Sequence, residues 1–206
     1  MKFILPDIWK LIMKSALLLS TALLASAAHA DVLGLTAEAG TFMTNDAEDF
    51  NSYFGIAVEH PIPLIPNVRL QNQSLEEKVG TSTIDLSYND YTLYYEFLDG
   101  LLWLDLDAGV TFRKIADAGN SDIDGTYPLA YVSAYVSFPG TALSVGGEVK
   151  TGGGSDADIN DTTFKIKYQP LVFAGIEAGY RTVTEDFDTA GKFEPKGAFI
   201  GVFVDF

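Results

Sequence analysis

Three serines and one histidine are the residues of this sequence that could support hydrolysis. Ser133, Ser137 and Ser144 lie in segments where apolar and polar residues alternate. A serine nucleophile needs a base within hydrogen-bond reach, and His60 is the one histidine after residue 30. His60 directly precedes Pro61, which favours a residue of a short turn. The serines therefore lack a base, and we expect a protein that is not an enzyme.

A second candidate chemistry involves paired carboxylates. Asp105 and Asp107 stand two residues apart, so in a strand both side chains face the same side. Two such carboxylates can share a proton, which raises the pKa of one of them. A lysine or arginine that faces the same space would pair with them instead, and we expect this ion pairing.

Two acidic segments place oxygen ligands at i, i+2 and i+4, as calcium-binding loops do. A calcium loop carries glutamate at its twelfth position, where these segments have Tyr131 and Lys167. Solvated acidic loops are therefore the expected state, and we predict no cofactor. The remaining candidates for weak binding of Ca²⁺ or Mg²⁺ are Asn120, Asp122, Asp124, Asp156 and Asp158.

Composition limits the elements that position these residues. The chain has 206 residues, with 28 acidic and 13 basic side chains and a formal net charge of −15. This length fits one domain, or at most two. An acidic surface repels a phosphate backbone, so nucleic acid is not expected as a partner. A hydrophobic content of 48% excludes a disordered acidic chain, and the absence of cysteine excludes disulfides and thiolate metal sites.

Residues 1–30 have the pattern of a secretory signal peptide. A basic start and an apolar run precede the small-residue site Ala28-His29-Ala30. The apolar run is shorter than the roughly 20 residues that a membrane-spanning helix needs. We predict cleavage after this site, a mature domain of residues 31–206, and translation from Met1 or Met13. The mature domain keeps 10 basic and 27 acidic residues, hence a net charge of −17.

The mature chain alternates apolar and polar residues with a period of two, and no window sustains the helical period of 3.6. Segments of about ten residues match the length of a tilted transmembrane strand. Ten of them predict an all-β fold, an antiparallel up-and-down transmembrane barrel of ten strands. A change of face in the fourth segment predicts a bulge near Asn89-Asp90. The segments lie near residues 33–40, 53–59, 68–75, 84–97, 102–113, 130–138, 143–150, 164–169, 172–181 and 198–206.

The lengths of the connections separate a membrane barrel from a soluble sandwich. Short periplasmic turns and long outer loops on an even number of strands are typical of outer-membrane barrels. Segment 68–75 is irregular, because Asn72 and Ser74 fall on its apolar face; without it and a neighbour the barrel would have eight strands. The predicted tight links are 61–67, 98–100, 139–141 and 169–170, and the predicted long loops are 44–50, 76–82, 114–126, 151–162 and 184–196.

The C-terminus ends in an apolar face that closes with an aromatic residue. Gly201, Val204 and Phe206 resemble the assembly signal of bacterial outer-membrane barrels, although Phe199 stands where that signal usually has a polar residue. Other stretches, notably PIPLIPNV from Pro61 and LYYEFLD from Leu93, resemble a family of small, largely uncharacterised proteobacterial outer-membrane barrels. This resemblance covers the mature chain and implies a fold and a location, without catalytic residues.

Charged residues within the strand segments share the polar face, which we assign to the lumen. A lysine or arginine that faced the bilayer midplane would cost about 2–4 kcal/mol. Inside a narrow barrel such charges must pair or be hydrated, and a salt-bridged plug is favoured over a conduit because side chains fill barrels of about eight strands. Asp90 and Asp205 share this face with the predicted lumen residues. These are Glu38, Glu59, Arg69, Glu96, Asp105, Asp107, Arg113, Glu148, Lys150, Lys165, Lys167, Glu177 and Arg181.

We therefore predict an integral outer-membrane barrel, not an enzyme, that serves as a structural surface protein or a narrow passage for small solutes. Its expected partners are outer-membrane lipid, lipopolysaccharide and the barrel-assembly machinery, and its expected state is a monomer. The alternative is a soluble secreted or periplasmic barrel that binds an apolar ligand. That alternative requires apolar residues inside and charges outside, so the direction of the side chains distinguishes the two.

Overall fold

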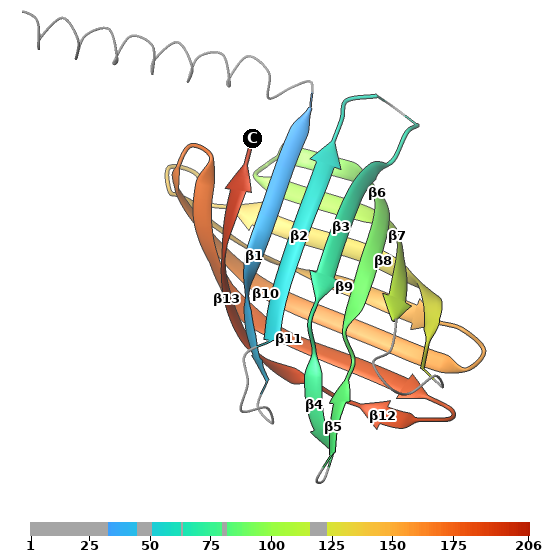
Figure 1. The fold of residues 1–206 in the computed structure, drawn as a ribbon. Helices are drawn as coiled ribbons and strands as arrows, with labels where there is room; N and C mark the ends of the chain where they lie inside the picture. The colour runs from blue at the N-terminus through green and yellow to red at the C-terminus, as the bar shows by residue number, and fades with distance from the viewer. Residues whose placement is uncertain (1–32, 45–50, 63, 80–81, 116–122) are drawn as a thin grey trace, which may run out of the picture.

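The computed structural model describes residues 33–44, 51–62, 64–79, 82–115 and 123–206, which form a closed antiparallel barrel of ten strands (Figure 1). Three short strands, β4 (Glu76–Val79), β5 (Ser82–Asp85) and β12 (Gly191–Phe193), extend the barrel at one end. The predicted ten-stranded all-β fold is confirmed. The barrel strands are β1 (Gly34–Thr44), β2 (Asn51–Glu59), β3 (Asn67–Gln73), β6 (Tyr88–Leu101), β7 (Leu104–Ile115), β8 (Gly125–Ser137), β9 (Leu143–Gly153), β10 (Ala157–Leu171), β11 (Ala174–Phe187) and β13 (Lys196–Asp205).

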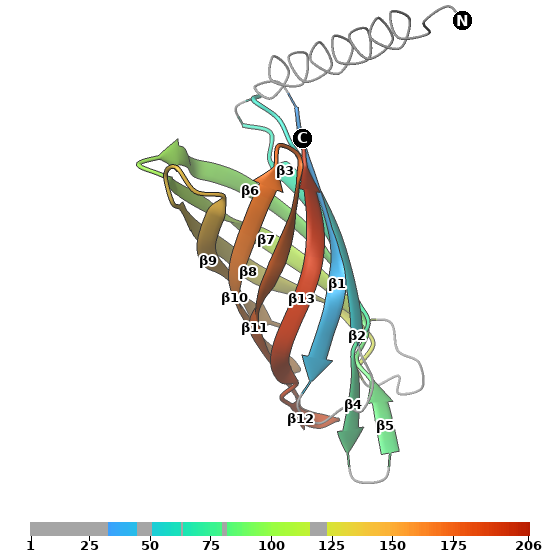
Figure 2. The same ribbon diagram turned by 90° about the vertical axis from the view of Figure 1, so that its left-hand side faces the viewer.

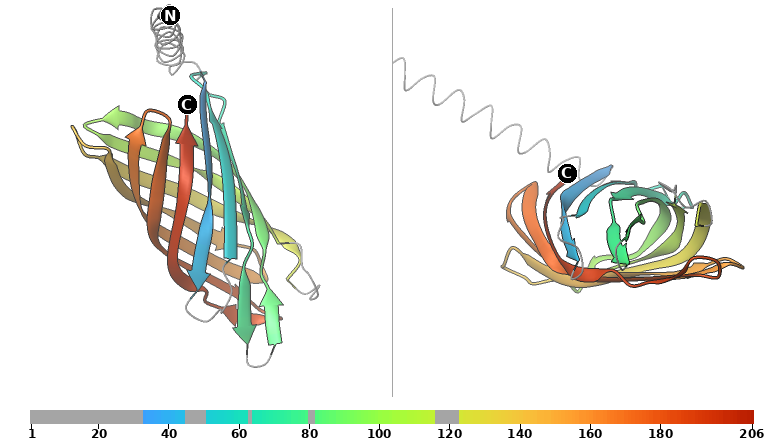
Figure 3. Two further views of the ribbon diagram at one scale, coloured as in Figure 1. Left: turned by 60° about the vertical axis from the view of Figure 1, so that its left-hand side comes forward. Right: turned by 60° about the horizontal axis from the view of Figure 1, so that its bottom comes forward.

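The first and last barrel strands are neighbours, and their pairing closes the ring. Strands β1 and β13 run side by side in register from Thr36↔Asp205 to Thr44↔Gly197 (Figure 2). Two reciprocal backbone hydrogen bonds of 3.0 Å between Leu35 and Phe206 continue this pairing to the last residue. The right-hand view of Figure 3, in which the bottom of Figure 1 comes forward, shows the ring of strands with β4 and β5 at the near end. Closure leaves no unpaired edge among the described barrel strands, which removes the aggregation hazard of an open sheet.

The two faces of the barrel wall differ in chemistry, in the sense that the alternation predicts. Val132 and Ile176 are 46% and 54% exposed on the outer face, whereas Lys165 and Glu177 are 4% and 1% exposed inside. The outer face is therefore apolar and the inner face carries ions. No helix in the described part of the chain is long and apolar enough to span a membrane. Large apolar side chains on the outer face include Phe54, Leu93, Val110, Val132, Ile166, Ile176 and Val202.

The two ends of the barrel are unequal. At one end, called here the turn end, tight connections join β2–β3, β6–β7, β8–β9 and β10–β11. The β6–β7 turn consists of Leu102 (φ 57°) and Trp103 (φ 64°), and two successive left-handed residues make the hairpin turn that matches strand twist. At the opposite end, called the loop end, β4, β5 and β12 project beyond the ring (Figure 1). The chain that joins β3 to β6 and β11 to β13 at this end is longer than the turns opposite, whereas β9 and β10 are joined here by three residues, so the predicted separation of short and long connections is present only in part.

Three predicted long loops are instead largely strand. In the expected loop 76–82, residues 76–79 form β4, which pairs with β5. Strand β9 continues to Gly153 and β10 begins at Ala157, so the expected loop 151–162 is a long hairpin. Likewise β11 continues to Phe187 and pairs with β12 inside the expected loop 184–196. These extensions carry polar residues outward and apolar residues such as Ile159 inward, where Ile159 is fully buried. The prediction was wrong there because the polar outer face was interpreted as a loop.

Two finer predictions were also wrong. Register is continuous through Asn89 and Asp90, and the shifts in the β6–β7 pairing lie between Glu96 and Leu101. The apolar side chains of Leu86 and Tyr88 needed no bulge, because they point into the barrel and are buried there. The predicted links at 98–100 and 169–170 are displaced, because β6 runs to Leu101 and β10 to Leu171, and the turns consist of residues 102–103 and 172–173.

Segment 68–75 forms a barrel strand, β3, and the alternative of eight strands is excluded. Asn72 is exposed on the outer face, and its amide donates a 2.9 Å hydrogen bond to the side chain of Asn89 on β6. The polar interruption of the apolar face thus has a partner on the neighbouring strand. The predicted signal peptide, both candidate start residues, Asn120 and Asp122 lie outside the described residues.

Candidate functional site

The interior of the barrel is organised around two clusters of buried ion pairs. The cluster nearer the loop end is called here the upper cluster, although the loop end is at the bottom of Figure 1. It centres on Arg113, whose side chain has no exposed surface. Its guanidinium donates to Asp90 at 2.9 Å, to Asp161 at 2.6 Å and to Glu185 at 3.0 Å. The guanidinium carbon also lies 3.7 Å from the centre of the Tyr88 ring. One cation on β7 thus ties together β6, β10 and β11.

Two further cations complete the upper cluster. Lys150 donates 2.7 Å hydrogen bonds to Asp90 and to the side-chain oxygen of Gln71. Arg181 binds both carboxylate oxygens of Asp161 and donates to the hydroxyl of Tyr88. Three cations therefore face three carboxylates, so the cluster balances its own charge. This balance is what allows so many ions to remain buried.

The lower cluster contains two cations and three carboxylates. Arg69 donates to Glu38 at 2.6 Å and to Glu148 at 3.0 Å. Lys165 lies 2.9 Å from Glu38 and 3.0 Å from Glu177. Tyrosines share the excess negative charge, since Tyr53 donates to Glu177 at 2.6 Å and Tyr135 to Glu148 at 3.0 Å.

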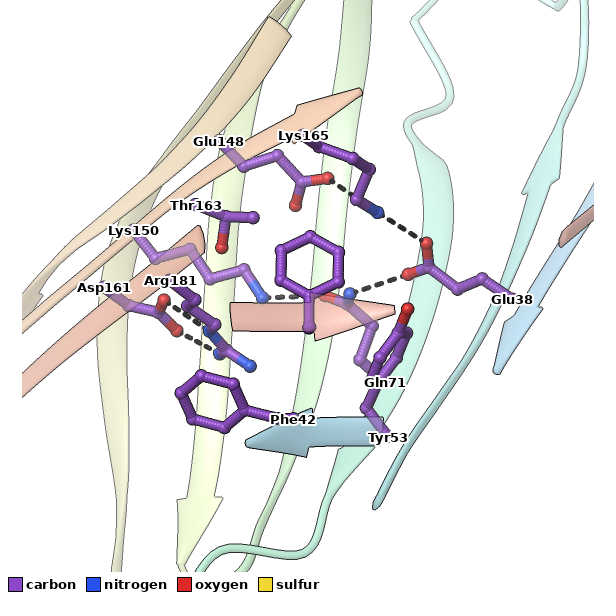
Figure 4. Close-up of a pocket in the computed structure, with 11 residues that line it drawn as sticks. Glu38, Phe42, Tyr53, Gln71, Glu148, Lys150, Asp161, Thr163, Lys165 and Arg181 are labelled. Carbon is purple, nitrogen blue, oxygen red and sulfur yellow. Dashed lines mark hydrogen bonds and ion pairs between the residues drawn. The ribbon is translucent and has the colours of Figure 1, made fainter. Parts of the chain in front are cut away.

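A small cavity of about 40 Å³ lies between the two clusters (Figure 4). Figure 4 shows Lys165 and Glu38 on one side of it and Arg181 with Asp161 on the other. Its volume is of the size that a few water molecules occupy, and its lining supplies the polar partners that such waters need. The two clusters are therefore close enough to act as one polar plug.

An apolar layer covers the plug at the loop end. Its members come from β1 round to β13, and each is at most 5% exposed. Edge-on contacts between rings hold it together, with centroids 5.8 Å apart for Tyr53 and Phe199 and 5.7 Å for Tyr127 and Phe187. The layer and the ion clusters together fill the barrel from its middle to its loop end. The layer consists of Phe42, Leu75, Leu86, Tyr88, Ile115, Ile123, Phe187, Phe193 and Phe199.

The turn end, in contrast, holds a cavity of about 310 Å³, called here the vestibule. Its inner limit is the lower ion cluster, with Arg69, Glu38 and Glu148 in its lining, and its outer part includes the exposed residues Asp99 and Asp205. Among the charged residues of the described lining, eight are acidic and two are basic. The interior thus divides into an acidic cavity open at the turn end, a polar plug and an apolar layer.

The structure distributes the thirteen predicted lumen residues over these regions. Eight of them, Glu38, Arg69, Arg113, Glu148, Lys150, Lys165, Glu177 and Arg181, belong to the two ion clusters. The other five, Glu59, Glu96, Asp105, Asp107 and Lys167, line the vestibule. The expected pairing of Asp105 and Asp107 with a lumen cation is replaced for Asp107 by a 2.6 Å hydrogen bond from the Ser133 hydroxyl.

Two interior carboxylates were assigned to loops by the sequence analysis. Asp161 and Glu185 are 3% and 0% exposed, and both bind Arg113. A signal was present, because Asp161 is in phase with Lys165 on β10 and Glu185 with Arg181 on β11. Continuing the period of two through the supposed loops would have placed both inside.

The candidate hydrolytic and metal-binding residues are dispersed. His60 accepts a hydrogen bond from the backbone of Ile62 within its own turn, and Ser137 bonds to Ser144 at 3.0 Å. Asp158 lies in strand β10, where alternate side chains stand roughly 6.6 Å apart and do not wrap round one ion as a loop does. No cluster of three or more metal-ligating side chains occurs among the residues with described positions.

The C-terminal residues occupy the seam between first and last strands. Phe206 stacks on Phe173, with ring centroids 5.7 Å apart. Gly201 leaves room for the Tyr53 hydroxyl, since a Cβ there would come within 2.1 Å of it. This glycine therefore permits the bond from Tyr53 to Glu177, and Val204 pairs with Ala37 across the seam.

Comparison with known proteins adds a likeness to a solved structure. No protein-family model matches the chain, and no curated protein sequence matches it either. Among solved structures it is similar to a major outer membrane protein from Thermus thermophilus, with a TM-score of 0.36 and 12% identity, over 85% of this chain and 100% of that chain.

Proposed function

We propose that this chain is an integral outer-membrane β-barrel with a closed interior, a structural protein of the cell surface that is neither an enzyme nor an open passage. The observation that carries the proposal is the direction of the side chains. Each of the ten barrel strands presents large apolar side chains on its outer face, while paired ions lie buried inside. A soluble carrier of an apolar ligand needs the opposite arrangement, with a dry apolar interior and charges in water.

The height of the apolar outer face fits a bilayer. On β7 it runs from Leu104 to Phe112, and the next outward residue, Lys114, is charged. Eight steps of about 3.4 Å on a strand tilted by about 40° give a height of roughly 21 Å. The apolar turn residues Leu102 and Trp103 add a few ångströms, which brings the height to the roughly 25 Å of known barrels. This match supports a transmembrane position.

The closed interior supports a structural role over transport. The apolar layer lies across the loop end. Next to it, the three cations and three carboxylates of the upper cluster form a plug with no net charge. Opening a path for solutes would require separating buried ion pairs, and each broken pair costs about 3–5 kcal/mol. We therefore propose that the resting barrel does not conduct.

Partners follow from the outer face. Lipid covers the apolar wall, and the barrel-assembly machinery inserts the chain with its C-terminal strand as the signal. The apolar part of the outer face is called here the belt. Beyond it, at the loop end, lies a polar surface of Asp158, Asn160, Thr162, Thr182, Thr184, Asp186 and Lys192. Divalent cations would link such an acidic surface to the phosphates of lipopolysaccharide. We propose a monomer.

Cell fractionation and planar-bilayer recording test the proposal together. We expect the mature protein in the outer-membrane fraction, where it resists extraction without detergent and changes gel mobility on boiling. We expect no unitary current from the purified barrel in a planar bilayer. Recovery in the soluble periplasm would overturn the location, and a steady unitary current would overturn the closed interior.

A further inference from the structure

The vestibule at the turn end has the composition of a binding site for an organic cation. We propose that it binds a small aliphatic diamine or polyamine, with ammonium groups on its carboxylates and methylene groups against its aromatic rings. This inference goes beyond the structural role proposed above. Only the side of the membrane that the vestibule faces depends on that role, because binding can be measured on the barrel in detergent.

Charge is the first argument. Two cations are present in the described lining, Arg69 and Lys167, and Arg69 is already bound to Glu38 and Glu148. Apart from Glu38 and Glu148, the carboxylates of the described lining outnumber Lys167, the one remaining cation, several-fold. A cavity with a low-dielectric wall and one sign of charge concentrates counter-ions of the opposite sign. These carboxylates are Glu59, Glu96, Asp99, Asp105, Asp107 and Asp205.

The second argument is that the cavity already holds one alkylammonium group. The Nζ atom of Lys167 lies 4.9 Å from the centre of the Tyr135 ring and 5.3 Å from that of Phe203. Among the described residues, no carboxylate comes within 4.0 Å of it. Its ammonium therefore relies on ring faces, which attract cations through their quadrupole. The wall thus accepts an amine on an aliphatic chain.

Neutral donors orient two of the carboxylates toward this space. The Tyr94 hydroxyl donates to Glu59 at 2.7 Å, and the Ser133 hydroxyl donates to Asp107 at 2.6 Å. Each carboxylate offers about four acceptor positions, so capacity for an ammonium remains. A fixed carboxylate loses little entropy when it binds, which favours affinity.

Size and ligand geometry favour an organic cation over a metal ion. The cavity volume of about 310 Å³ is at the lower end of ligand sites, which start at about 300 Å³. A metal ion needs several ligands close together, and no cluster of three or more metal-ligating side chains exists among the residues whose positions are described. The aromatic rings of Tyr94 and Tyr131, with centroids 6.0 Å apart, suit methylene groups.

Calorimetric titration of the purified mature barrel in an uncharged detergent tests this proposal. The probe is 1,4-diaminobutane at low ionic strength, with 1,4-butanediol as the neutral molecule of the same length and MgCl₂ as the inorganic divalent cation. Gel mobility before and after boiling confirms that each variant is folded. We expect saturable binding of the diamine and none of the diol.

Four variants separate a built site from general attraction. Asp107→Asn should weaken diamine binding by about tenfold or more, the loss expected for one charge-assisted hydrogen bond. Asp188→Asn, which removes an exposed acid at the loop end, should leave it unchanged. Phe203→Leu should weaken diamine binding by about threefold, as loss of a cation–π contact implies, without affecting Mg²⁺. Lys167→Met should strengthen it, because a resident cation is removed, and a damaged fold does not produce such a gain.

Three results would overturn the proposal. The first is the absence of diamine binding at millimolar concentration. The second is equal binding of Mg²⁺ with no effect of Phe203→Leu, which would show a counter-ion atmosphere only. The third is an equal loss in Asp107→Asn and Asp188→Asn. None of these results depends on where the barrel lies in the cell, so the proposed membrane role would stand or fall separately.

Discussion

Replacing Arg113 by methionine should destabilise the barrel more than any other single change in its polar interior. The side chain is fully buried and binds three carboxylates. Without it, Asp90 keeps Lys150 and Asp161 keeps Arg181, but Glu185 keeps no cation among the described residues. One buried charge is left without compensation. Because removal of one partner of a buried pair costs about 3–5 kcal/mol, we expect the free energy of unfolding to fall by that amount.

The assay is urea unfolding of the refolded barrel in detergent or in lipid vesicles, followed by gel mobility or by the emission of Trp103. The matched control is Lys114→Met, because the adjacent Lys114 is exposed on the outer face of the same strand. A surface change of this kind alters the free energy of unfolding by about 0.5 kcal/mol or less. The comparison therefore isolates the buried ion pairs from the loss of one positive charge.

A second substitution sharpens the test. Adding Glu185→Gln to Arg113→Met removes the unpaired charge, and we expect the double variant to recover roughly 1–3 kcal/mol of the loss. The reasoning is refuted if Arg113→Met costs less than about 1 kcal/mol, or if the double variant is no more stable than the single one. Either result would mean that water reaches the upper cluster.

Three further predictions concern the outer wall and the seam. Trp103 is the one tryptophan of residues 31–206; in vesicles its emission should shift to the blue and be quenched by brominated lipids, whereas a turn that stayed in water would show neither. Val132→Arg should abolish outer-membrane accumulation, because an arginine facing the middle of the bilayer costs about 2–4 kcal/mol. Thr126→Arg, on the same face of β8 near the loop end, should be tolerated. Equal behaviour of the two variants in fractionation would contradict the assigned belt. Deleting Phe206 should slow assembly, since its ring stack with Phe173 and its backbone bonds to Leu35 would be lost; an unchanged rate in pulse–chase labelling would exclude a role in recognition.

The barrel could be predicted because the alternation of apolar and polar residues is a local property of each strand. Counting the alternating segments gave the number of strands. The inner and outer faces followed from the same parity, as Val132 and Lys165 illustrate. The loop-end extensions were missed because the projecting ends of β9, β10 and β11 carry polar residues on their outer face, which removes the alternation. Asp161 and Glu185 were misplaced for that reason.

The partners within the lumen could not be predicted in the same way. The alternation of residues predicts that Arg113 faces inward. The shear of the barrel, however, determines which residues of other strands face it across the lumen at the same height. Arg113 on β7 meets Asp161 on β10 and Glu185 on β11, positions 48 and 72 residues away. The vestibule is also a product of this packing, because the same inward parity yields filled space near Phe42 and open space near Asp107.

The ion clusters join the two halves of the chain, and this has a consequence for biogenesis. A polypeptide that had emerged only as far as β8 would carry Arg113 without Asp161 or Glu185, and Arg69 without Glu148. Closing such an intermediate would bury these cations with only part of their counter-charge, so we expect an incomplete chain not to close into a barrel. Completion of the last hairpins supplies the missing counter-charges and the final strand at nearly the same moment. We therefore expect the barrel to close in one late step, after strands β9 to β13 have become available.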